Sequence, residues 1–213
     1  MSDIPLKNLL TEIRNCDFCT HDLPLGANPV IQASSTAKIL IIGQAPGTRV
    51  HDTGIPWNDP SGNKLRQWLQ LSDADFYDEN QIAIMPMGLC YPGKGKSGDL
   101  PPRKECAPKW HHQVFEHLPD LKLILLIGQY AQRSYLKDGH NTVTERVKHA
   151  AETEAPFFPL PHPSPRNQIW LKKNPPDLFW KAVLISTFLL PDTSTSCSHR
   201  TTFESKPWLY SVS

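Results

Sequence analysis

Four of the five cysteines are spaced as ligands of a metal centre. Cys16 and Cys19 form a CxxC pair near the start of the chain, and Cys90 and Cys106 follow with fifteen residues between them. Thiolates presented by separate loops suit tetrahedral zinc or an iron–sulfur cluster, because both prefer sulfur ligands. Residue type does not separate these two alternatives. The remaining interpretation is that Cys90 is a small buried apolar residue and the other three are incidental.

The segment 43–62, GQAPGTRVHDTGIPWNDPSG, combines glycines with an isolated aromatic residue. Gly43 and Gly47 permit a close approach of the backbone, and the helix expected after this segment could receive an anion at its amino terminus. Trp57 stands among prolines and small polar residues, where its ring could stack on a nucleobase. The alternative is that Trp57 only anchors the loop to the core.

A second polar segment, 160–175, reads LPHPSPRNQIWLKKNP. His162 comes at its start and could donate a hydrogen bond to a developing oxyanion, although a single histidine can equally be structural. Five polar or cationic residues after it are candidate phosphate contacts. They are Ser164, Arg166, Asn167, Lys172 and Lys173.

Buried strands and amphipathic helices must position these residues. The apolar runs predict strands over 37–43, 81–87, 121–128 and 155–161, and the pattern between them predicts helices over 4–14, 62–71, 107–118, 129–136 and 177–190. This alternation predicts a three-layer α/β/α sandwich around a largely parallel four-stranded sheet. Ligands of such sheets bind beyond the carboxyl ends of the strands, so we expect Trp57 near His162.

Length and composition favour one domain over residues 1–190, followed by a flexible tail over 191–213 that is rich in Ser and Thr. The net charge of +1 argues against blanket basicity but is compatible with a local basic groove. No secretory signal is apparent, and the longest apolar run, Leu123–Ile127, is too short to span a membrane. We therefore expect a monomeric cytoplasmic protein with reduced thiols.

Four motifs in register resemble those of the uracil-DNA glycosylase superfamily. They are GQAPG at 43–47, TGIPW at 53–57, IGQYA at 127–131 and HPSPRN at 162–167. The cysteine pattern resembles that of the family 4 enzymes, which carry a 4Fe-4S cluster. The resemblance covers roughly residues 10 to 190 and implies a DNA-repair glycosylase that acts on DNA containing a damaged base. Such an enzyme flips the base into a pocket and hydrolyses its N-glycosidic bond, leaving an abasic site.

The resemblance also implies roles for individual residues. Trp57 matches the aromatic that stacks on the base, and His162 matches the histidine that stabilises the departing anion at its O2. The catalytic pair would be His162 and Gln44. Gln44, Ala45 and Gly47 match the loop that lines the pocket and positions the attacking water, and Arg166 falls in the loop that wedges into the duplex. The four cysteines would hold the cluster, with zinc as the alternative.

Two positions depart from the family pattern. The first motif offers Gln44 and Ala45 where the family usually has Asp, Glu or Asn to activate water, so no carboxylate stands there, and Pro86 stands where family 4 has an Asn that reads the base. Substitutes within the first loop are open among His51, Asp52, Asn58 and Asp59. Two rival functions follow: a non-catalytic module of the same fold that binds damaged or single-stranded DNA, and a metal-stabilised domain with an unrelated small ligand.

Overall fold

The computed structural model describes residues 4–173, apart from the side chain of Arg166. The helix predicted over 177–190 and the tail predicted over 191–213 lie outside this part. Within it, no helix combines the length and the apolar character needed to cross a membrane.

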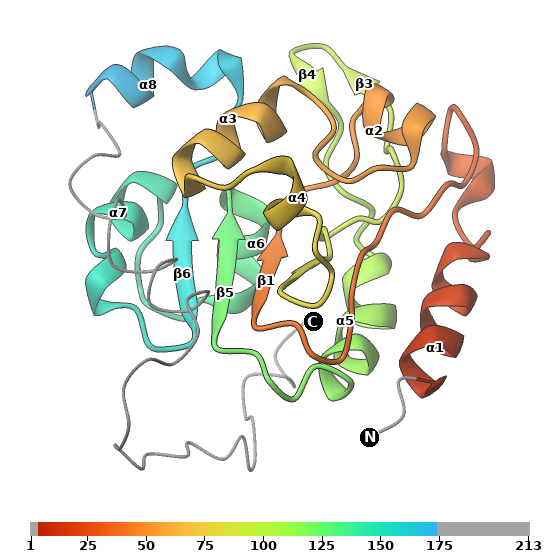
Figure 1. Cartoon of the computed structure of the whole chain (residues 1–213). Helices are drawn as coiled ribbons and strands as arrows, with labels where there is room; N and C mark the ends of the chain where they lie inside the picture. Colours follow the sequence, from red (N-terminus) through yellow and green to blue (C-terminus); the bar gives the residue numbers. More distant parts are fainter. Residues whose placement is uncertain (1–3, 174–213) are drawn as a thin grey trace, which may run out of the picture.

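A four-stranded sheet forms the centre of the fold (Figure 1). Its strands are β1 (Ile39–Ile42), β2 (Ile82–Ile84), β5 (Leu123–Ile127) and β6 (Phe157–Leu160). The order across the sheet is β2-β1-β5-β6, and every neighbouring pair is parallel. Each predicted strand is present, and the parallel arrangement is confirmed. All four strands therefore end at one edge of the sheet, which lies uppermost in Figure 1.

Alternate residues of the strands face opposite layers, as the pleat of a strand requires. Leu40 and Ile42 pack with one group of helices, whereas Ile39 and Ile41 pack with another. The first layer contains α1 (Ile4–Arg14), α5 (Cys106–Glu116) and α6 (Gln129–Tyr135). The second contains α3 (Pro60–Leu69) and α4 (Asp73–Phe76). The predicted α/β/α sandwich is confirmed.

Several short elements were not expected from the apolar pattern, because six residues give too few turns to show a period. The helices among them are α2 (Thr48–Thr53), α7 (Val143–Lys148) and α8 (Gln168–Lys173). Single 3-10 turns span Thr20–Asp22, Ala150–Glu152 and Pro165–Asn167. A hairpin of β3 (Lys94–Gly95) and β4 (Gly98–Asp99) projects from the loop between β2 and α5. In Figure 1, α2, α8 and this hairpin lie above the carboxyl edge of the sheet.

Candidate active site

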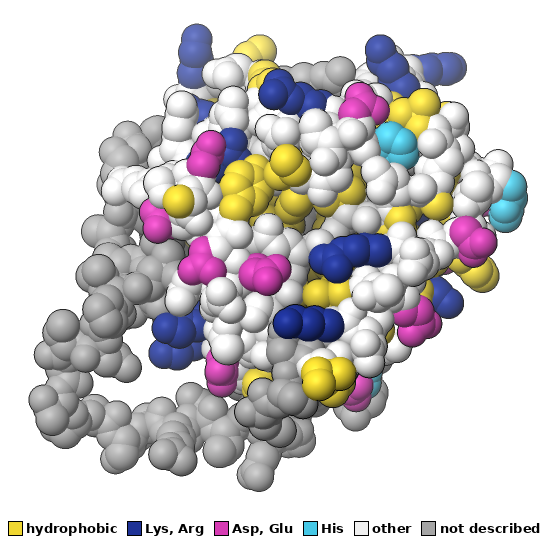
Figure 2. All heavy atoms as spheres, turned by 45° about the vertical axis from the view of Figure 1, so that its right-hand side comes forward, with side chains coloured by type: hydrophobic (Ala, Val, Ile, Leu, Met, Phe, Trp, Pro, Cys, Tyr) yellow, Lys and Arg dark blue, Asp and Glu magenta, His cyan; other side chains and the backbone are white. Residues whose placement is uncertain are grey.

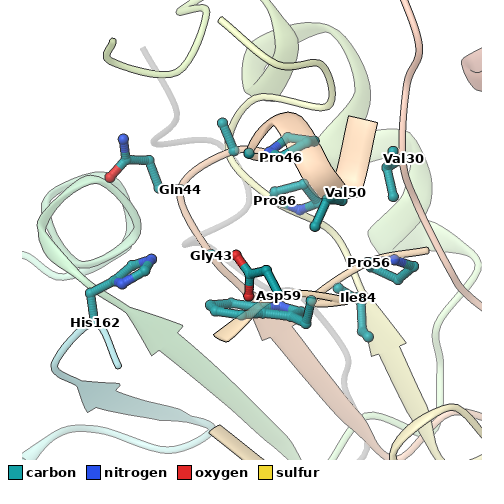
Figure 3. Close-up of a pocket in the computed structure, with 13 residues that line it drawn as sticks. Val30, Gly43, Gln44, Pro46, Val50, Pro56, Asp59, Ile84, Pro86 and His162 are labelled. Carbon is teal, nitrogen blue, oxygen red and sulfur yellow. The ribbon is translucent and has the colours of Figure 1, made fainter. Parts of the chain in front are cut away.

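A pocket opens at the carboxyl edge of the sheet (Figure 3). It is bounded by the ends of β1, β2 and β6 and by the segment that leads from β1 to α3. The residues that line it are Val30, Gly43, Gln44, Ala45, Pro46, Gly47, Val50, Pro56, Trp57, Asp59, Ile84, Pro86 and His162. The two motifs that the sequence placed at strand ends thus meet in one cavity.

Trp57 forms a wall of this pocket beside His162, with 5.7 Å between the ring centroids and 36° between the ring planes. Two glycines make room for it. A Cβ at Gly43 would lie 2.8 Å from Cζ2 of the indole, and a Cβ at Gly62 would lie 1.7 Å from the Trp57 carbonyl oxygen. The close approach that the sequence suggested at Gly43 is therefore an approach to the indole.

Trp57 has a φ of 57°, a left-handed conformation that is unfavourable for a bulky residue. Neighbouring side chains hold the segment in place. Arg66 Nη1 donates to the Trp57 carbonyl oxygen at 3.3 Å, and the Tyr77 hydroxyl donates to the Pro56 carbonyl oxygen at 3.0 Å. Arg66 is itself buried and pairs with Asp73 at 2.7 Å. Surroundings that over-determine a strained residue are typical of functional sites.

His162 follows β6, and its backbone is fixed from two sides. Asn167 Nδ2 donates to the His162 carbonyl oxygen at 2.9 Å, and the buried Gln132 donates to the carbonyl oxygen of Leu160 at 2.8 Å. Burial lowers the pKa of His162, and the charge of Asp59 acts in the opposite direction. Among the described residues, its buried Nδ1 has no hydrogen-bond partner. At neutral pH the ring is therefore uncharged and offers one N–H donor.

The first-motif residues Gln44, Ala45 and Gly47 all line the pocket. The side chain of Gln44 is engaged elsewhere, because its Nε2 donates to the Leu100 carbonyl oxygen at 3.4 Å. In Figure 3 the Gln44 amide points away from Asp59. Its side chain thus links the pocket rim to the segment that follows the β3–β4 hairpin.

Pro86 lines the pocket after β2, and its carbonyl oxygen is bound from behind by the buried His111. A carbonyl can only accept, so His111 Nε2 donates at 3.1 Å and Nδ1 accepts from the Tyr135 hydroxyl. Pro86 has no N–H and its carbonyl is occupied. This position therefore presents the apolar proline ring to a ligand.

Because the buried His111 is neutral, we expect the folded protein to lose stability in acid. Burial lowers its pKa from 6.5 to about 4. Because the unfolded state takes up the proton first, the stabilisation is complete above pH 6.5 and is lost as the pH falls toward 4. At about 1.4 kcal/mol per pKa unit, His111 contributes at most about 3–4 kcal/mol to this loss.

Urea unfolding at pH 7 and at pH 4.5 measures this contribution. His111→Gln lowers stability at pH 7, and its stability then falls less on acidification than that of the wild type. His117→Gln, at a half-exposed position on the same stretch of chain, keeps the wild-type pH dependence. An equal fall in the His111 variant and the wild type would show that His111 does not resist protonation.

The five candidate phosphate contacts differ in their surroundings. Lys172 and Lys173 are exposed at the end of α8, and Ser164 is half-buried close to His162. The Asn167 amide is bonded to the His162 carbonyl and so has a structural task that the sequence did not suggest. The side chain of Arg166 lies outside the described part of the chain.

Further exposed cations lie on elements above the carboxyl edge: Arg49 on α2, and Lys94 and Lys96 on the hairpin. Figure 2 shows Lys and Arg side chains gathered along this upper edge of the molecule. The sequence did not point to these three residues, because they lie far from His162 along the chain and reach the same edge of the sheet only in the folded protein. The site therefore has a cationic rim in a protein whose net charge is only +1.

The four cysteines that were predicted as metal ligands lie near one another, outside this pocket, and all four are free thiols. Cys16, Cys19 and Cys106 each raise the pKa of Cys90 electrostatically, and burial, the larger cause, raises it to about 12. The backbone N–H of Asn28 donates to Cys90, and that of Leu89 donates to Cys106. Within residues 4–173, however, no three His, Cys, Asp or Glu side chains are arranged to hold a metal ion.

Arg103 links the two chain segments that carry these cysteines. Its guanidinium hydrogen-bonds to Cys19, and Nη2 donates to Asp22 at 2.8 Å and to Glu105 at 3.0 Å. Asp22 follows the CxxC pair and Glu105 precedes Cys106, so one side chain ties both cysteine-bearing segments. The spacing of the cysteines gave no sign of this residue.

Of the four substitutes in the first loop, only Asp59 lines the pocket. The Asn58 amide donates to Thr53, Asp52 is exposed on α2, and the ring of His51 lies beside Tyr91. The loop after β1 therefore brings one carboxylate to Trp57 and His162.

These features agree with the comparison of the whole chain against known families. Residues 31–184 match the family described as the uracil DNA glycosylase superfamily. The matched region contains the whole sheet, both motif loops and every pocket-lining residue except Val30. The chain therefore belongs to the uracil DNA glycosylase superfamily.

Proposed function

We propose that this protein is a DNA-repair glycosylase that hydrolyses the N-glycosidic bond of uracil or another deaminated base. The observation that carries the proposal is the meeting of Trp57 and His162 in one pocket, 5.7 Å apart at their ring centroids. An aromatic wall binds the face of a base, and a neutral N–H donor beside it suits the oxygen of a departing base anion. Superfamily membership supports the same class of activity.

The pocket supports a mechanism in which the damaged base flips out of the duplex and enters the pocket. The exposed cations of α2, α8 and the hairpin would hold phosphates along the edge, and the flipped base would lie against Trp57. His162 donates its N–H to the base as negative charge develops there. Since burial keeps His162 uncharged, this donation needs no prior proton uptake. Gln44, Ala45 and Gly47 would form the wall against which the attacking water is placed.

The wall at Pro86 bears on the choice of base. It offers no amide to read the uracil edge, and its carbonyl is held away by His111. A site with few hydrogen bonds to the base discriminates weakly between related bases, because a wrong base leaves few buried polar groups unpaired. We therefore expect the protein to accept deaminated bases beyond uracil.

A panel of duplexes carrying uracil, hypoxanthine or xanthine tests the proposed activity. After incubation, alkali cleaves the strand wherever a base has been lost. Strand cleavage on at least one duplex supports the glycosylase. Binding of a damaged duplex without cleavage on any of the three would instead support the rival, a non-catalytic DNA-binding module of the same fold.

We propose further that the chain is of the iron–sulfur type and that Cys16, Cys19, Cys90 and Cys106 hold a 4Fe-4S cluster. The four thiols lie near one another, and three of them, those of Cys19, Cys90 and Cys106, receive N–H groups from Arg103 or the backbone, as cluster sulfurs do. With bonds of about 2.3 Å, a single zinc ion needs sulfurs within about 3.8 Å of each other. A four-iron cluster spans a wider set. When bound, it would cross-link the start of the chain to the segment 90–106.

Anaerobically purified protein is expected to be brown and to contain iron and acid-labile sulfide. Cys90→Ser should lose colour and iron together, because one of the four ligands is removed. Cys197→Ser serves as the matched control and should keep both. A colourless wild-type protein that holds stoichiometric zinc would show that the site binds zinc and not a cluster. Absence of any bound metal would contradict the proposed metal site.

A further inference from the structure

The pocket contains a carboxylate although its first motif has none. GQAPG supplies Gln44 and Ala45, and the Gln44 amide is bonded to Leu100. Asp59 reaches the same pocket from the other end of the loop, two residues after Trp57. Figure 3 shows the His162 ring and the Asp59 carboxylate entering the pocket from different elements.

Asp59 is held rigidly. It is the N-cap of α3, and its Oδ1 accepts the backbone N–H of Gly62 at 2.7 Å. This bond uses one carboxylate oxygen, so the second oxygen can make another interaction. The charge of Asp59 is also felt by His162, whose pKa it raises against the larger effect of burial. A fixed carboxylate therefore lines the same pocket as the neutral His162 ring and acts on it electrostatically.

We infer that Asp59 is the catalytic carboxylate of this pocket, stabilising the positive charge that develops on the sugar and accepting a proton from the attacking water. The inference rests on the proposed glycosylase function and names the residue that replaces the missing acid of the first motif. His162 and Asp59 then divide the reaction. His162 serves the departing base, and Asp59 serves the sugar and the water.

In the proposed step the C1′–N bond breaks, and its electron pair leaves with the base, to which His162 donates a hydrogen bond. Water oxygen forms the new bond to C1′ and releases one proton to the Asp59 carboxylate. Asp59 then returns this proton to solvent and the base anion takes one up from solvent, so the products are the neutral free base and an abasic sugar, and water is the only other reactant. Placing a negative charge where positive charge develops lowers the barrier most in a site that excludes water.

Asp59→Asn separates catalysis from structure. Asparagine caps helices as well as aspartate does, so α3 keeps its N-cap while the negative charge is removed. We expect base release to fall about 100-fold or more, which is typical when a general base is lost. Asp52→Asn is the matched control, because it removes the same charge from an exposed position of the same loop. It should leave the rate unchanged.

A second readout does not depend on turnover. The pKa of His162, followed by NMR of its imidazole, should fall in Asp59→Asn because the stabilising charge is gone, and should stay constant in Asp52→Asn. An unchanged His162 pKa in Asp59→Asn would refute the placement. Wild-type base release by Asp59→Asn, in a protein whose His162→Ala variant is inactive, would refute the role of Asp59 alone. No base release by the wild type from any duplex would overturn both the role and the proposed function.

Discussion

His162→Ala is expected to reduce base release by about 10²–10³-fold, which is about 2.7–4 kcal/mol of transition-state stabilisation. Bond cleavage moves an electron pair onto the departing base, and His162 is the neutral N–H donor that lines the pocket beside Trp57. The loss should appear in single-turnover rates measured with saturating protein. DNA binding should change little, because the donor acts as charge develops and not in the ground state.

The fold of the variant can be checked independently. The His162 ring is half-buried at the end of β6, while the backbone there is held by Asn167 and Gln132. His162→Ala should therefore keep the unfolding transition of the wild type. His149→Ala, which removes a half-exposed ring elsewhere on the surface, controls for the loss of a histidine. Base release by His162→Ala at the wild-type rate would show that His162 is structural.

Trp57→Ala is expected to weaken binding of damaged duplex by about 10- to 100-fold. Stacking of a base on an aromatic ring contributes about 1–3 kcal/mol, and the indole forms the wall beside His162. Equilibrium binding to duplexes with and without the damaged base measures the effect. Only the affinity for the damaged duplex should fall, because the phosphate contacts along the rim remain.

Trp57→Phe is the matched variant, since it keeps an aromatic face on the same backbone. It should retain most of the affinity that Trp57→Ala loses. Both substitutions leave Arg66 and Tyr77 in place to hold the carbonyl oxygens of the segment. Equal binding of the damaged duplex by Trp57→Ala and the wild type would show that the indole only packs the loop onto the strand end.

The meeting of Trp57 and His162 could be predicted from the sequence. Both follow buried strands, and parallel strands bring their carboxyl ends to one edge whatever their distance along the chain. The same reasoning gave the sheet and its two layers of helices, because continuous apolar runs such as Leu123–Ile127 are typical of strands covered on both faces.

The choice of Asp59 could not be made in this way. The sequence pattern does not distinguish among the four polar side chains of the first loop. Only the position at which α3 begins determines which of them enters the pocket. A signal was present: an aspartate followed by proline is a common start of a helix, and Asp59 precedes Pro60. Asn167, Gln132 and Arg103 gave no such signal, because their partners are fixed only by the folded chain.

Free base released from duplex DNA is the most direct measurement of the proposed function. The wild-type protein is incubated with its best substrate of the uracil, hypoxanthine and xanthine duplexes, and free base and abasic sites are both quantified by mass spectrometry. We predict one free base for each abasic site formed, with both lost in parallel in His162→Ala. Tight binding of the damaged duplex with no free base, by folded wild-type protein, would contradict the proposal that the protein is a glycosylase.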